Sequence, residues 1–273
     1  MIEIKNISEL SVLNELKREY FSSTTAPIDG MWHFGFVPMS AHYGFYENEE
    51  LVGFCCINSD GYLLQYFLSQ AALTQTDVLF AQLIDRENEG AVIGEVKGAF
   101  VSTAETQFLS LSLDHAGSTN VNSLMYQVRK GTRSVPLPDI DLQLATSEHL
   151  SELVDFAVET LGAPKEWLSG YFGNLVARKE LWAYWVQGEV VATGECRLND
   201  EFQTNTADLG MIVAKNQRGK GVATRILQKL ASYAQRKGLL AICSTESANI
   251  GAQKSISKAG FIAQNRIVQV NFK

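Results

Sequence analysis

The sequence predicts an α/β (α+β) protein in which a mixed central sheet is flanked by helices, and it predicts that this plan occurs twice. The first observation is the length of 273 residues, which leaves room for about two domains. The second is the order of periodic segments in residues 139–273: strand, two helices, three strands, helix, strand, helix, strand. The third is that residues 1–132 repeat this order loosely.

A connection between the two halves is predicted at "KGTRSVPLPDI". Pro136 and Pro138 stand two residues apart, which favours an extended segment over a helix. We therefore expect an N-terminal domain over residues 1–132, a linker over 133–138 and a C-terminal domain over 139–273.

In the C-terminal half, each element follows from apolar periodicity and from turn or cap residues. Helix 146–162 has Thr146 or Ser147 as a cap and Gly162 at its end, and hairpin 181–198 turns at Gln187-Gly188. The unit around "RGKGVA" should place two parallel strands side by side. The expected elements are strand 139–145, helices 146–162 and 164–180, hairpin 181–198, strand 207–214, helix 221–238, strand 239–245, helix 249–260 and strand 261–272.

The N-terminal half has weaker signals in the same order. Alternating and apolar runs indicate strands, and spacings of three and four indicate helices. The expected elements are strand 1–7, helix 8–21, hairpin 42–58 turning near Glu49-Glu50, strand 61–69, helix 74–88 and strand 91–103.

Charge and composition exclude several classes of function. The net charge is −7, with about −8 in residues 1–135 and +1 in 136–273, which argues against nucleic acid as the partner. No apolar run approaches the roughly 18–20 residues of a membrane helix. The four cysteines are scattered, which indicates reduced thiols, and the N-terminus has no secretory pattern, so we expect a cytoplasmic protein. No pair of cysteines has the spacing of zinc ligands, so we expect no metal.

The stretch "NQRGKGVATRIL" carries two glycines and two cations directly before a helix. A Walker loop needs Ser or Thr after Lys220, but Gly221 stands there, and a dinucleotide fingerprint needs glycine where Thr224 stands. A turn with a solvated charged rim is the plain alternative. The same stretch also suits the binding of a pyrophosphate, because it combines unpaired N–H groups at a helix start with small residues and two cations.

Two signatures resemble the GCN5-related N-acetyltransferase (GNAT) family. The first is Arg-x-x-Gly-x-Ala at Arg218, Gly221 and Ala223, after a strand. The second lies about 30 residues later and matches the family's Asn-x-x-Ala/Ser…Lys-x-Gly-Phe segment at Asn249, Ala252, Lys258, Gly260 and Phe261. The resemblance implies the acyl-CoA N-acyltransferase fold for residues 139–273 and acetyl-CoA as co-substrate. It implies a degenerate second copy for residues 1–132, which match only in element order.

The resemblance also implies where acetyl-CoA binds. Pantetheine lies beside the strand that precedes the loop, like an added strand. The implied contacts are the backbone of Met211, Ile212 and Val213 for pantetheine, Arg218, Gly219, Lys220, Gly221, Val222, Ala223 and Thr224 for the pyrophosphate, and Asn249 for the pantetheine arm. The side chains on the strand also suit the core, and Asn249 also suits a helix N-cap.

The catalytic groups are less clearly marked. Family members use a carboxylate or water as base and often a tyrosine seven residues after the motif asparagine as acid, but Ile256 stands at that position. Glu195 and Asp208 are the candidate bases because they lie on the strands next to the loop. Arg197 shares a strand face with Glu195, so a structural ion pair is the alternative reading.

The predicted function is transfer of an acetyl group from acetyl-CoA directly to an amine of a small molecule or peptide. The alternative is an acyl-CoA-binding, sensing or assembly protein without catalysis. Transfer to a hydroxyl and transfer of a longer acyl group both stay open, as do a monomer and a homodimer. The N-terminal half reads "SQAALTQTD" where a second loop would stand, so it offers a pyrophosphate neither paired glycines nor a cation.

Overall fold

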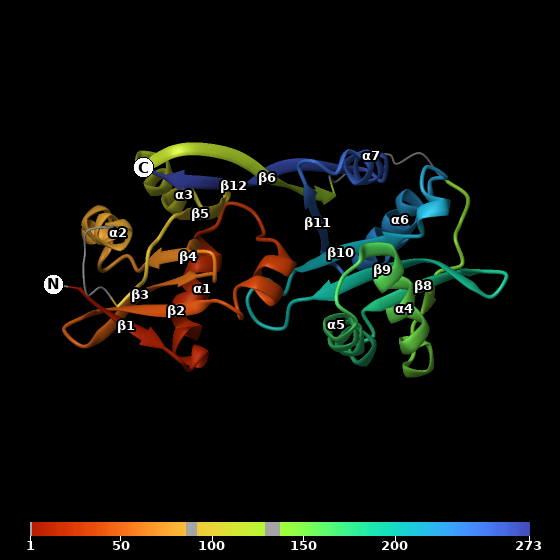
Figure 1. The fold of residues 1–273 in the computed structure, drawn as a ribbon, viewed down its shortest axis with the longest axis horizontal. Helices are drawn as coiled ribbons and strands as arrows, with labels where there is room; N and C mark the ends of the chain where they lie inside the picture. The colour runs from red at the N-terminus through yellow and green to blue at the C-terminus, as the bar shows by residue number, and fades with distance from the viewer. Residues whose placement is uncertain (1, 86–91, 129–136) are drawn as a thin grey trace. The chain divides into compact units, whose positions relative to one another are not determined.

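The computed structural model describes residues 2–85, 92–128 and 137–273, without the side chains of His33 and Phe34 (Figure 1). The chain divides into two compact units. The first comprises residues 1–124 and 265–273, and the second comprises residues 125–264. The predicted linker at 133–138 lies mostly outside the described residues.

The first unit contains a mixed sheet. Neighbours from β1 to β4 pair antiparallel, β4 and β5 pair parallel, and β5 pairs antiparallel with β12. The strands are β1 (Glu3–Ile7), β2 (Ala41–Glu47), β3 (Glu50–Ile57), β4 (Tyr62–Leu68), β5 (Gly98–Ser102), β6 (Ala116–Val128) and β12 (Phe261–Phe272). Residues 125–128 of β6 and 261–264 of β12 belong to the second unit. The helices are η1 (Leu10–Leu13), α1 (Asn14–Ser23), η2 (Trp32–Phe36), η3 (Leu73–Gln75), α2 (Thr76–Ile84) and α3 (Thr106–Asp114).

The first unit differs from the prediction in several details. The hairpin turns at Asn48-Glu49, whose φ values of 50° and 70° suit a two-residue turn between twisted strands. The strand predicted from residue 91 begins only at Gly98. Ile93 and Val96 are buried by irregular backbone, so their apolar pattern reflects loop packing. Helix α3 and strand β6 were not predicted.

The second unit repeats the pairing pattern of the first. From β7 to β10 the neighbours pair antiparallel, and β10 pairs parallel with β11, as the sequence predicted for the strands around "RGKGVA". The strands are β7 (Gln143–Leu144), β8 (Leu181–Val186), β9 (Glu189–Leu198), β10 (Thr206–Val213) and β11 (Leu240–Glu246). The helices are η4 (Ser147–His149), α4 (Leu150–Leu161), α5 (Lys165–Ala177), η5 (Lys215–Gln217), α6 (Val222–Arg236) and α7 (Ile250–Lys258).

The two units therefore share one plan, and the prediction of two copies of a mixed sheet flanked by helices is confirmed. In each, a strand and helical segments precede three antiparallel strands, and a further helix then leads to a parallel strand. Strand β7 is shorter than the predicted 139–145, because Asp139 binds Lys229 and Leu142 N bonds to Ile140 O instead of to a neighbouring strand. No described helix is long and apolar enough to cross a membrane.

The last strand closes the first unit. Residues 267–271 of β12 pair with β5 of the first unit (Figure 1). Val270 is fully buried in the core of this unit. We expect Val270→Ala to lower the free energy of unfolding by about 2 kcal/mol, because truncating a core side chain leaves a cavity. Urea unfolding followed by circular dichroism measures this. Val121→Ala, which truncates a side chain that is 45% exposed, is the control and should change stability by less than about 0.5 kcal/mol. Equal effects of the two variants would contradict the burial of Val270.

In the second unit, different helices cover the two faces of the sheet. A Cβ added at Gly194 would lie 2.7 Å from Ile226 of α6, so α6 packs directly on that face. Successive strand residues point to opposite faces, and Glu195 therefore faces the side covered by α4 and α5. Side chains from these two helices, among them Leu153 and Phe172, form the core there.

Candidate functional site

The parallel strands β10 and β11 pair only at their starts. Their register runs through Thr206↔Leu240, Ala207↔Ala241 and Asp208↔Ile242 and then stops, whereas β10 stays paired with β9 as far as Val213. On the side of β10 that faces β11, the backbone of residues 209–213 therefore pairs with no strand that the structure describes. Met211, Ile212 and Val213, predicted to bind pantetheine, lie there and are half-buried. A split of this kind accepts an extended ligand as an added strand.

The predicted pyrophosphate loop lies at the end of β10. Gly219 and Gly221 both have φ of 77°, a left-handed conformation that side chains other than glycine rarely adopt, and a Cβ at either would meet open space. Gly221 is the N-cap of α6, and no side chain caps this helix. The first N–H groups of α6, on Val222, Ala223 and Thr224, thus begin a helix whose positive dipole end lies at an exposed loop.

The two cations of the loop are exposed and held by local contacts. Arg218 Nε donates to Val213 O at 3.2 Å, and Lys220 Nζ donates to Gln217 Oε1 at 3.0 Å. Both partners are uncharged, so the positive charge of each side chain remains available to an anion. The buried hydroxyl of Thr224 donates to Ser255 O at 3.3 Å and ties the start of α6 to α7.

Asn249 lies at the N-cap of α7, three residues after the end of β11. Its Oδ1 accepts a hydrogen bond from Ala252 N at 3.1 Å, so the cap that the sequence suggested is present. The side chain is exposed, and its amide nitrogen is not used by the cap. The cofactor residues predicted from sequence therefore gather at the carboxyl ends of two adjacent parallel strands, β10 and β11.

The candidate bases Glu195 and Asp208 bind the same arginine. Arg197 Nη1 lies 3.0 Å from Glu195 Oε2, and Arg197 Nη2 lies 2.9 Å from Asp208 Oδ2. The side chains are almost fully buried, with 6% of Glu195 and 1% of Asp208 exposed. Burial lowers the pKa of Arg197, but the charges of Asp208 and Glu195 outweigh it and hold that pKa well above its ordinary value. The Glu195–Arg197 ion pair, which the sequence analysis gave as the alternative reading, is present. Asp208, at the last position where β10 pairs with β11, also binds Arg197.

Tyr171 on α5 also belongs to this cluster, although the sequence analysis did not predict it. Its hydroxyl donates to Glu195 Oε2 at 2.6 Å and accepts from Arg197 Nη1 at 2.8 Å. Burial and the charge of Glu195 raise the pKa of Tyr171, so the phenol stays protonated at neutral pH. Trp167 stacks on Tyr171 with ring centroids 5.1 Å apart. The only local signal is that Trp167 and Tyr171 are four residues apart on a helix, which places them on one face.

Ile256, at the position of the family's tyrosine, and its neighbour Ser255 supply no acid to the split. Ile256 is 1% exposed and packs in the core. The Ser255 hydroxyl donates to Gly251 O at 3.1 Å on its own helix. In the part of the chain that the structure describes, no group of three or more His, Cys, Asp and Glu side chains is placed to hold a metal ion.

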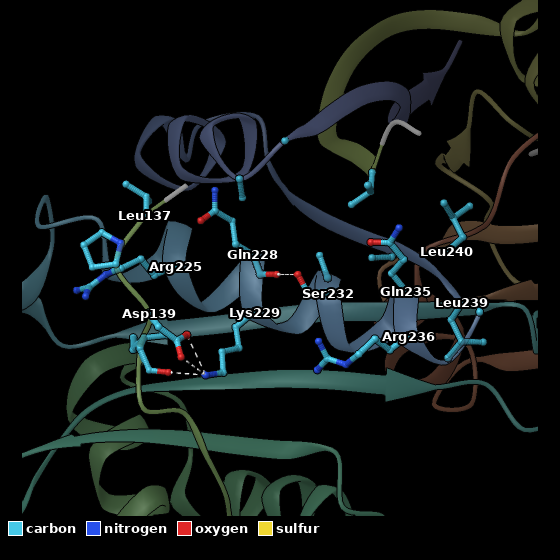
Figure 2. A pocket seen from close by; sticks show the side chains of 18 of the residues that line it. Leu137, Asp139, Arg225, Gln228, Lys229, Ser232, Gln235, Arg236, Leu239 and Leu240 are labelled. Atoms are coloured by element: carbon cyan, nitrogen blue, oxygen red, sulfur yellow. Dashed lines mark hydrogen bonds and ion pairs between the residues drawn. The ribbon is translucent and has the colours of Figure 1, made fainter. Parts of the chain in front are cut away.

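A hollow of about 1030 Å³ lies along the side of α6, away from its start (Figure 2). Three cations of α6 line it, namely Arg225, Lys229 and Arg236. Figure 2 shows Lys229 bound to Asp139, with Nζ 2.9 and 3.0 Å from the two carboxylate oxygens. None of residues 211–224 lines this hollow, so it is separate from the predicted acetyl-CoA contacts.

Comparisons with known proteins identify the family of both halves of the chain. Residues 9–129 match the Acetyltransferase (GNAT) domain, and residues 147–261 match the Acetyltransferase (GNAT) family. An acetyltransferase of the GNAT family from Colwellia psychrerythraea is 52% identical over 99% of this chain and 100% of that one, with a TM-score of 0.94. A search of curated proteins found no match.

Two more distant structures share the fold. A tandem GNAT protein from the clavulanic acid biosynthesis pathway is 12% identical over 100% of this chain and 98% of that one, with a TM-score of 0.61. A GCN5-related N-acetyltransferase from Sphaerobacter thermophilus is 12% identical over 98% of this chain and 94% of that one, with a TM-score of 0.63.

The chain belongs to the GNAT acetyltransferase family, and it carries two GNAT domains in tandem. Members of this family use acetyl-CoA. The predictions of the family and of the tandem arrangement are therefore confirmed.

Proposed function

We propose that this protein transfers the acetyl group of acetyl-CoA directly to an amine of a small molecule or peptide, and that the second unit carries out the reaction. The observation that supports this most is the split between β10 and β11, which opens toward the uncapped start of α6. A pantetheine arm fits along the free edge of β10, and a pyrophosphate fits at a positive helix end beside Arg218 and Lys220.

Each predicted contact has a distinct task in this proposal. The backbone of Met211, Ile212 and Val213 bonds to the amides of the pantetheine arm. The N–H groups of residues 219–224 bind the pyrophosphate, because small residues let it approach the backbone. The Asn249 amide nitrogen donates to a carbonyl of the arm while Oδ1 caps α7.

For the chemistry, we propose Asp208 or Glu195 as the group that receives the proton of the attacking amine, directly or through a water. Asp208 supports this role by its place, because it lies at the residue where β10 and β11 separate. Glu195 contacts Tyr171 and Arg197, which hold the carboxylate in one orientation. The nitrogen attacks the thioester carbonyl, the C–S bond breaks, and CoA leaves as a thiolate, which is a tolerable leaving group without a protein acid.

A second candidate function is acyl-CoA binding without transfer. Two observations favour it: Ile256 is buried where the family often has a tyrosine, and both candidate carboxylates are engaged by Arg197. Such a protein would keep the split and the loop but would not release CoA.

Two measurements separate these functions. Calorimetric titration should show binding of acetyl-CoA whether the protein transfers the acetyl group or only binds acyl-CoA. A thiol-reactive dye should then detect free CoA at a rate that rises with the concentration of added amines, including peptides with a free N-terminus. Binding without amine-dependent release of CoA, across a broad panel of amines, would favour the second function. The absence of binding would refute both.

A further inference from the structure

The first unit has its own opening at the position that corresponds to the split in the second unit. Strands β4 and β5 pair in parallel at Tyr62↔Gly98 and Leu63↔Ala99, and then their register stops. A pocket of about 400 Å³ lies beyond this point, between the end of β4, the end of α1 and the start of α3. Its volume falls within the range of small-molecule sites.

The charge of this pocket is opposite to that of the loop in the second unit. Glu19 and Glu105 line it, and its described lining contains no Lys or Arg. Between β4 and α2, residues 69–75 supply no cation either. Aromatic side chains, among them Tyr66 and Phe108, make up much of the remaining wall. This lining disfavours a pyrophosphate and suits a ligand with a positive charge and an apolar body.

Glu105 is the buried polar group of the pocket. It is 8% exposed, its Oε1 accepts from the Tyr20 hydroxyl at 2.7 Å, and its Oε2 accepts from Ser102 N at 2.9 Å. No cation pairs with it among the described residues. Burial raises the pKa of Glu105 to about 7, although the bonds from Tyr20 and Ser102 act in the opposite direction. A buried carboxyl group without a counter-ion gains most from a ligand that brings one.

We propose that this pocket of the first unit binds a small organic amine as its ammonium ion, with the charge at Glu105 and the apolar body among the aromatic side chains. The proposal does not rest on the acetyl transfer assigned to the second unit. It gives the first unit a ligand of its own, chemically unlike acetyl-CoA.

Groups on three elements act on or lie close to Glu105. On α1 these are Tyr20 and Glu19, together with Lys17, whose charge acts on Cys56. On β3 it is Cys56, and on β4 it is Tyr66. Burial raises the pKa of Tyr20 and of Tyr66, and raises that of Cys56 to about 12, so these three are neutral near pH 7. Glu105 is thus the buried group here whose charge a bound ammonium would change.

The test is calorimetric titration of the full chain, without acetyl-CoA, with 2-phenylethylamine and with its neutral counterpart 2-phenylethanol. At pH 8 we expect the amine to bind about tenfold more tightly than the alcohol or better. At pH 6, titrations in two buffers of different ionisation enthalpy should show proton release on binding of the amine, because the ammonium ion shifts Glu105 to its charged form. Absence of binding, or equal affinity for both probes, would overturn the proposal.

Glu105→Gln should weaken binding of the amine about tenfold or more and abolish proton release, while leaving the affinity for the alcohol unchanged. Glu50→Gln, on the exposed start of β3, is the matched control and should behave as wild type. Unchanged affinity for the amine in Glu105→Gln would place the amine elsewhere and overturn the assignment.

Two further measurements guard against a folding defect. The folded pKa of Glu105 lies above its unfolded value, so its contribution to stability is present at low pH and is lost as the pH rises through about 7. Glu105→Gln should remove this loss and be at least as stable as wild type at pH 8. Gln70→Trp, at an exposed position of the rim, should block both probes without altering the core. Binding that persists in Gln70→Trp would contradict this location.

Discussion

Replacing Gly221 by Glu should abolish binding of acetyl-CoA, with a loss of affinity of about 100-fold or more. The substitution acts in two ways. It places a carboxylate at the start of α6, where the proposal puts a pyrophosphate, so that like charges repel. It also places a side chain where φ is 77°, so the loop must shift. Calorimetric titration with acetyl-CoA measures the effect.

The matched control is Gly238→Glu, after the other end of the same helix. Gly238 has φ of 75°, and a Cβ added there also meets open space. The two variants should therefore lose similar stability, by about 1 kcal/mol, while only Gly221→Glu loses acetyl-CoA. Binding by Gly221→Glu as tight as wild type would remove the loop from the site. Loss of binding in both variants would point to a general effect on α6.

Replacing the carboxylate that accepts the proton of the amine should strongly lower the rate of acetyl transfer. If Asp208 is the base, Asp208→Asn should lower kcat for acetyl transfer by about 10²–10⁴-fold, because the amide cannot take a proton from the amine. Glu195→Gln should then have a smaller effect, and the order reverses if Glu195 is the base. The KM for acetyl-CoA should stay within a few-fold of wild type in both variants, because neither carboxylate belongs to the proposed cofactor contacts. Steady-state kinetics of CoA release measures both constants.

Glu180→Gln is the control for burial and ion pairing. Glu180 is 4% exposed and binds Arg178 at 2.8 Å, as the candidate bases bind Arg197, but it stands outside the proposed cofactor contacts. The Glu180→Gln variant should be less stable than wild type, but its folded fraction should keep the kcat of wild type. If Asp208→Asn and Glu195→Gln both keep kcat at the level of this control, neither carboxylate is the base. The cluster around Arg197 would then be structural, with water as the proton acceptor.

Much of the fold could be predicted because its signals are local. The turn at Gln187-Gly188 and the end of helix α4 at Gly162 depend on residues a few positions apart, and both were predicted correctly. The cap at Thr146 is one of the two that the sequence offered. The loop from Arg218 to Gly221 also lies where the sequence placed it, directly before helix α6, and its two glycines have left-handed conformations. Misplaced boundaries, such as the start of β5 at Gly98, arose where apolar residues pack without pairing in a sheet.

Tertiary structure alone decided which distant residues meet. Tyr171 reaches Glu195 across 24 positions, because α5 covers the sheet face to which Glu195 points. Asp208 binds Arg197, as Glu195 does, because the register of β9 and β10 sets Asp208 directly opposite Arg197. No periodicity in one segment encodes a register or a helix position, since both result from the packing of the whole unit. The sequence by itself thus determined the family, the order of the main elements in the second unit and the position of the loop that the proposal assigns to acetyl-CoA. The buried cluster around Arg197, the place of β12 in the first unit and the pocket at Glu105 depended on contacts that only the folded chain makes.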